Sequence, residues 1–191
     1  MVKVGFVVEG SSEKRLIDSA NFHALCASYG IEICKPIIVI GGIGDGGCDI
    51  TGFIRDCRSQ AHPDQVLVLV DLENAPCFQE CKANLGGIET ADTIVIARRT
   101  LEAWFMADIE AFARWVQGKI SIPFPELEQN NFALLKTLEK ILDIRGPGVN
   151  HESFAKTMLN SKYDFSLERA ARHPHCPSAQ YFLTALQRLA R

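Results

Sequence analysis

The feature that most constrains this fold is a run of five consecutive apolar residues at positions 66–70. The run is too short for a helix, and it has no polar position that could face water. Strands that are apolar at every position are typical of parallel sheets buried on both faces. Three other segments have a similar character and are also predicted as strands, namely residues 2–8, 31–40 and 93–97.

Helical patterns fill the intervals between these apolar runs. Helices are expected from Ser11 and Ser12 to residue 28 or 29, over residues 49–61, and over residues 101–116. Because strand and helix alternate, we predict an α/β fold with a mostly parallel four-stranded sheet and helices on both faces.

The pattern changes after residue 117, where no further buried strand is predicted. Four helical stretches are expected instead, at residues 130–143, 151–161, 166–172 and 178–190. We therefore predict an α/β domain over residues 1–117 and a helical C-terminal extension over residues 118–191. The extension is expected to pack on the domain, so that the two form one compact unit.

Composition and charge exclude several functional classes. The 191 residues are 47% hydrophobic and 23% charged, as in an ordinary globular protein. With 20 basic and 23 acidic residues, the net charge of −3 argues against coating nucleic acid by bulk electrostatics. No apolar run is long enough for a membrane span, and the seven cysteines lack the spacing of a secreted disulfide framework. A cytoplasmic protein without a membrane partner is expected.

Acidic side chains follow three of the predicted strands. Glu9 ends the first strand, Asp71 and Glu73 follow the third, and Glu102 lies just beyond the fourth, while Glu13 is one helical turn after Glu9. The carboxyl ends of parallel strands meet at one edge of a sheet, where ligands bind. Carboxylates gathered there would repel one another unless a cation such as Mg²⁺ or Mn²⁺ lay between them.

A purely structural interpretation competes for each acid taken singly. Glu13 and Glu102 sit near predicted helix N-termini, where an acid is stabilising without any function. Asp71 could be a turn residue. The coincidence of acids at three strand ends nevertheless favours a metal site.

The segments that carry these acids resemble the metal-binding motifs of the Toprim fold. They are Glu9-Gly10-Ser11-Ser12-Glu13, Asp71-Leu72-Glu73 and Thr100-Leu101-Glu102. Within that fold, these motifs most resemble those of the overcoming-lysogenization-defect nucleases and of small bacterial Toprim-like proteins of unknown function that are often encoded beside an ATPase. Residues 98–108 resemble the most recognisable segment of that second group.

The resemblance implies specific roles for the acids. Glu9 would be the signature acid of the first motif, Asp71 and Glu73 the acidic pair of the second, and Glu13 and Glu102 ligands of a second metal. Two motif positions differ from the commoner residues, since the pair is Asp-x-Glu rather than Asp-x-Asp and Thr100 replaces a serine. Both differences keep an oxygen ligand.

The function implied is a Mg²⁺- or Mn²⁺-dependent nuclease that hydrolyses phosphodiester bonds of DNA or RNA. It would be a bacterial phage-defence or toxin-type effector working with an ATPase partner. No lysine stands beside the fourth strand, so Arg98 or Arg99 would contact the phosphate. The alternative is a regulatory module that has the Toprim scaffold and binds a metal or nucleotide without catalysing a reaction.

Two further motifs suggest weaker alternatives. Gly42, Gly44 and Gly47 follow a predicted strand and precede a helix, as in a dinucleotide-binding fingerprint, but additional glycines would loosen the helix start. The sequence also holds possible zinc ligands, although their spacing is poor and buried thiols are the better interpretation. These residues are Cys77, Cys81, His173, His175 and Cys176.

Overall fold

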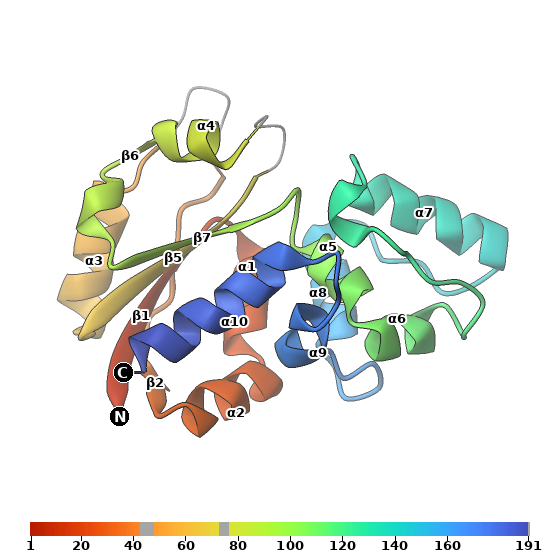
Figure 1. Ribbon diagram of the computed structural model, residues 1–191, viewed down its shortest axis with the longest axis horizontal. Coiled ribbons are helices and arrows are strands. Elements are labelled where there is room, and N and C mark those ends of the chain that lie inside the picture. Colours follow the sequence, from red (N-terminus) through yellow and green to blue (C-terminus); the bar gives the residue numbers. More distant parts are fainter. Residues whose placement is uncertain (43–47, 73–76, 191) are drawn as a thin grey trace.

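Parallel strands form the centre of the protein (Figure 1). The computed structural model describes residues 1–42, 48–72 and 77–190. Within these residues the main sheet has five strands in the order β2-β1-β5-β7, with β3 also paired to β1, and every pairing is parallel. The strands are β1 (Val2–Val8), β2 (Ile31–Ile33), β3 (Ile38–Val39), β5 (Gln65–Asp71) and β7 (Thr93–Ala97). The predicted α/β class with a mostly parallel sheet is confirmed.

The sheet has five strands rather than the predicted four because the run at residues 31–40 forms two short strands. Pro36 lies between β2 and β3, and proline has no backbone N–H to donate to a ladder. A second small sheet, which the sequence did not predict, pairs β4 (Cys48–Asp49) with β6 (Leu85–Gly86).

Two of the predicted long helices are each divided by a polar residue. Ser19 is extended and its hydroxyl accepts a hydrogen bond from the Phe22 backbone N–H, which starts a new helix. Asp108 caps a second helix in the same way through the Ala111 backbone N–H. In chain order, the helices of the described residues are α1 (Ser11–Asp18), α2 (Ala20–Ser28), α3 (Thr51–Ala61), α4 (Phe78–Ala83), α5 (Glu102–Ala107), α6 (Ile109–Trp115), α7 (Asn131–Leu142), α8 (His151–Met158), α9 (Leu167–Ala171) and α10 (Pro177–Leu189), with short 3-10 turns η1 (Ile88–Thr90) and η2 (Pro125–Leu127).

Helices cover both faces of the sheet. Alternate side chains of β1 point to opposite faces, so Phe6 and Val8 enter one hydrophobic cluster and Val7 enters the other. The first cluster joins the sheet to α1, α2, α5 and the C-terminal helices, and the second packs against α3, including Ile54. The predicted placement of helices on both faces is therefore confirmed.

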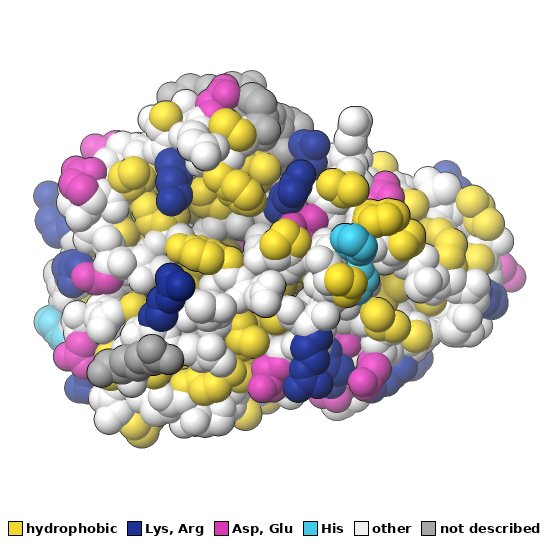
Figure 2. Space-filling model, viewed as in Figure 1, with side chains coloured by type: hydrophobic (Ala, Val, Ile, Leu, Met, Phe, Trp, Pro, Cys, Tyr) yellow, Lys and Arg dark blue, Asp and Glu magenta, His cyan; other side chains and the backbone are white. Residues whose placement is uncertain are grey.

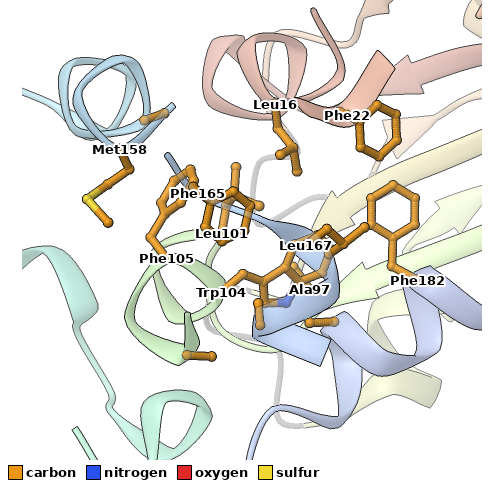
Figure 3. Packing of buried hydrophobic residues seen from close by; sticks show 14 of the residues in the cluster. Leu16, Phe22, Ala97, Leu101, Trp104, Phe105, Met158, Phe165, Leu167 and Phe182 are labelled. Carbon is orange, nitrogen blue, oxygen red and sulfur yellow. The ribbon is translucent and has the colours of Figure 1, made fainter. Parts of the chain in front are cut away.

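The C-terminal helices share the core of the sheet (Figure 3). Phe182 of α10 is fully buried, and its ring lies 5.6 Å from that of Phe22 and 5.4 Å from that of Trp104. The Trp104 indole N–H donates to Ser178 Oγ at 2.7 Å, and Ser178 Oγ in turn donates to the buried Glu126 carboxylate. These contacts connect α10 to segments between 52 and 160 residues away in the sequence.

Residues 119–190 contain helices and connecting segments but no strand, as the sequence predicted. Within the described part of the chain, no helix combines the length and apolar character needed to cross a bilayer.

Candidate metal and phosphate site

A pocket of about 490 Å³ lies at the carboxyl edge of the main sheet. Glu9 directly follows β1, Asp71 is the last residue of β5, and Glu102 opens α5 after β7. Glu13 belongs to the first turn of α1. All four acidic side chains line this pocket, so the structure brings them together from three strand ends.

Three of these acids are buried, and three of the four accept hydrogen bonds from backbone N–H groups. Glu9, Glu13 and Glu102 are only 6%, 4% and 1% exposed. Glu9 Oε2 accepts from the Asp71 backbone N–H and Glu13 Oε2 from that of Gly10, both at 2.9 Å, while Asp71 Oδ2 accepts a longer bond of 3.4 Å from Leu101. The backbone therefore holds the acids at the sheet edge but satisfies only part of their acceptor capacity.

Burial and mutual repulsion shift two of the acids toward their protonated forms. The pKa of Glu13 is raised to about 7, chiefly by burial and also by the nearby carboxylates of Glu9 and Glu102, against the lowering effect of its backbone hydrogen bonds. The pKa of Asp71 is raised well above its ordinary value by burial and by the charges of Glu13, Glu102 and Glu9. A divalent cation would relieve the same repulsion without protonation.

Glu102 is the most deeply buried of the four acids and still has unused acceptor capacity. Its Oε2 has no hydrogen-bond partner among the described residues, and neither has Asp71 Oδ1. The Nδ1 atom of His151 lies 2.9 Å from Glu102 Oε1, and His151 stacks on Phe132 at a ring distance of 4.6 Å. Buried carboxylate oxygens without partners are costly unless a ligand or ion satisfies them.

The donor set fits a hard cation in its chemistry. Carboxylates from Glu9, Glu13, Asp71 and Glu102, with the Thr100 hydroxyl also lining the pocket, are the oxygen ligands that Mg²⁺ and Mn²⁺ prefer. Within the described ranges, however, no three His, Cys, Asp or Glu side chains are already arranged to hold a metal ion. The carboxylates of Glu9 and Glu13 instead accept hydrogen bonds from backbone N–H groups.

The remaining predicted site residues have different placements. Arg98 and Arg99 follow β7 at the same edge of the sheet, but neither lines the acidic pocket. The Arg98 backbone N–H donates to Ser178 Oγ, and Arg99 adopts a positive φ of 68° with its Nε buried and without a hydrogen-bond partner among the described residues. Glu73 lies outside the described residues.

The two weaker alternatives receive little support from the placement of their residues. Gly42 lines the acidic pocket, whereas Gly44 and Gly47 lie outside the described residues. No zinc ligand set forms among the described residues: Cys81 and Cys176 are buried, Cys77 is exposed, and the His175 ring contacts the Phe124 ring in a tilted arrangement at 4.5 Å.

Sequence reasoning missed the contribution of residues 150–152 to this pocket. Asn150 caps α8 by accepting from the Ser153 backbone N–H, which places His151 and Glu152 on the wall opposite α1. The capping pattern was visible in the sequence, but nothing in it indicated that this helix begins at the acidic edge.

The fold and the pocket define an α/β protein with an acid-lined pocket at the carboxyl edge of a parallel sheet. No protein-family model matches the chain, and no curated protein matches it in sequence. Among solved structures, it is similar to the C-terminal region of the Burkholderia pseudomallei OLD protein, with 15% identity and a TM-score of 0.47 over 98% of this chain and 99% of that chain. The chemistry of the pocket therefore has to be argued from this chain's own residues.

Proposed function

We propose that this protein is a divalent-metal-dependent nuclease that hydrolyses phosphodiester bonds of DNA or RNA. The observation that carries the proposal is the gathering of Glu9, Glu13, Asp71 and Glu102 around one pocket, where the almost fully buried Glu102 keeps an oxygen without a hydrogen bond. Such carboxylates on rigid strand ends suit metal-assisted phosphoryl chemistry.

Each acid has a distinct part in this proposal. Glu9 and Asp71 hold Mg²⁺ or Mn²⁺, and Glu13 and Glu102 supply further oxygen ligands from the helix side. When bound, the cations activate a water molecule and stabilise the leaving oxygen. The pKa values of Glu13 and Asp71 are both raised, so each carboxyl would lose its proton to solvent when it takes up a cation. Glu73 remains a proposed ligand from its motif.

The substrate phosphate needs a positively charged partner beyond the metal. Arg98 and Arg99 are proposed for this contact because they leave β7 at the same sheet edge. Their side chains would have to turn toward the pocket, since neither lines it here.

The resemblance of the three acidic motifs to Toprim nucleases supports the same reaction. It also suggests a phage-defence or toxin role with an ATPase partner, and we include that partner in the proposal.

The test is cleavage of labelled plasmid DNA, single-stranded DNA and RNA with Mg²⁺, Mn²⁺ or EDTA, with and without ATP and the product of any adjacent ATPase gene. Glu9→Gln and Asp71→Asn should abolish a metal-dependent cut. Matched controls are Glu32→Gln, at the opposite end of the sheet beside Lys3, and Asp56→Asn on α3, both exposed. These controls should cut like the wild type.

The alternative is a regulatory module that binds metal without cleaving nucleic acid. It predicts calorimetric binding of Mn²⁺ that is lost in Asp71→Asn, together with no cleavage under any condition including the ATPase. Cleavage that persists in EDTA, or in both acid variants, would contradict the proposed mechanism.

A further inference from the structure

A second hollow, of about 420 Å³, opens beside the acidic pocket between α1 and α8. The two hollows share Ser11 and Glu152 in their walls, so they are neighbours along one stretch of surface between α1 and α8. The charge of the lining changes from the first hollow to the second, because Lys14, Arg15 and Lys156 line only the second one. We call this second hollow the basic groove.

The walls of the basic groove are two exposed helical stripes. On α1, Ser11, Lys14, Arg15 and Asp18 are exposed at the i, i+3, i+4, i+7 spacing of one helix face, while the neighbouring Glu13 is buried toward the acids. On the facing side, the half-buried Glu152 and the exposed Lys156 of α8 are followed, just beyond the helix, by the exposed Asn160, at intervals of four residues. The same turn of α1 thus presents an acid to the metal pocket and bases to the groove.

Ion pairs position the groove but do not cancel its charge. The Arg15 guanidinium joins α1 to α8 by binding Glu152 Oε1, with Nε at 2.7 Å and Nη2 at 2.5 Å. Lys14 pairs with Asp18 at 2.7 Å, and Lys35 contacts the other oxygen of the same carboxylate.

Lys156 is exposed and has no ion pair among the described residues. Together with Arg15 and Lys14, it gives the groove lining three cations against the two carboxylates of Asp18 and Glu152.

We propose that the basic groove binds the phosphate backbone of the nucleic-acid strand next to the scissile phosphate, which deepens the proposed function and rests on it. The eight residues of α1 extend for about 12 Å, the axial length of three to four nucleotides. Lysine and arginine contacts of this kind fix the register of the strand without reading its sequence. A local groove also explains how a chain with a net charge of −3 holds a polyanion. Lys and Arg side chains on the face drawn in Figure 2 are scattered among acidic and apolar ones.

The test is binding of fluorescent single-stranded DNA, duplex DNA and RNA over a range of salt, in Ca²⁺ and in EDTA. The double variant Lys14→Gln/Lys156→Gln removes two groove cations. Its matched control, Arg55→Gln/Lys140→Gln, makes the same charge change at exposed positions on α3 and α7. Lys14→Arg/Lys156→Arg keeps the charge, and thermal melting confirms that all variants are folded.

We expect the groove variant to bind at least about tenfold more weakly at 0.1 M salt. The slope of its log binding constant against log salt concentration should be shallower by about 1.5. The control pair and the arginine pair should bind like the wild type. Weakening restricted to the groove variant supports the groove whichever polymer binds best. Equal weakening in the control pair, or no binding of any strand by the wild type, overturns it.

Failure of the groove and failure of the proposed function are separable. If the groove variant binds normally while Glu9→Gln abolishes cleavage, the groove assignment is wrong and the nuclease stands. If binding depends on the groove but the wild type never cleaves, the groove stands and the hydrolysis proposal fails.

Discussion

Substitution of Glu13 by glutamine should have opposite effects on stability and on metal binding. Glu13 is 4% exposed, and burial together with the nearby Glu9 and Glu102 raises its pKa to about 7. Glutamine keeps the acceptor for the Gly10 backbone N–H and removes the charge. The variant should therefore be more stable without metal near neutral pH, and it should respond less to Mg²⁺.

The size of the effect follows from proton linkage. Between pH 4.5 and 7 the folded state binds more protons at Glu13 than the unfolded state does, so stability falls as pH rises through this window. The contribution of protonated Glu13 to folding stability is fully present below pH 4.5 and lost above about pH 7. A shift from 4.5 to about 7 corresponds to about 3 kcal/mol. Glutamine does not titrate, so the difference between variant and wild type should grow by about 2 to 3 kcal/mol from pH 5 to pH 8.

The assay is thermal unfolding at pH 5 and pH 8 in EDTA, repeated at pH 8 with Mg²⁺. In EDTA, the melting temperature of the variant minus that of the wild type should increase by about 5 to 10 °C between pH 5 and pH 8. Mg²⁺ should stabilise the wild type more than the variant by mass action. Glu32→Gln, an exposed acid at the other end of the sheet, should change in parallel with the wild type. A Glu13→Gln difference that stays constant between pH 5 and 8 would refute the reasoning.

Three further predictions concern the core and the domain organisation. Phe182→Ala should lower the free energy of unfolding measured in urea by about 3 to 5 kcal/mol, because the ring is fully buried against Phe22 and Trp104. A decrease of less than about 1 kcal/mol would contradict this packing. Asp108→Asn should lower the free energy of unfolding by about 2 to 4 kcal/mol, since the buried carboxylate accepts two hydrogen bonds from the Arg169 guanidinium. An unchanged free energy of unfolding would show that this ion pair makes no net contribution to stability. A fragment of residues 1–117 should lose near-UV circular dichroism, whereas an independent cooperative transition would show that the extension is a separate unit.

The sequence alone determined the strand framework and the edge at which the acids lie. Runs at residues 2–8, 66–70 and 93–97 are too short and too apolar to be anything but buried strands, and the observed strands agree within one residue. The acids that follow them had to reach the same edge once the strands were parallel. Even the helix breaks at Ser19 and Asp108 used residues that commonly cap helices, so a stricter use of capping would have found them.

Only the tertiary structure decided what faces the acids. His151 and Glu152 reach the acidic pocket because Asn150 starts α8 there, and Arg15 joins α1 to α8 through Glu152, 137 residues away in the chain. The two-residue pairing of β4 with β6 also depends on long-range neighbours. Hydrophobic period and caps are local properties that a sequence displays directly. Burial, repulsion between carboxylates and the charge of a groove arise only when distant segments meet, so they become visible only in the folded chain.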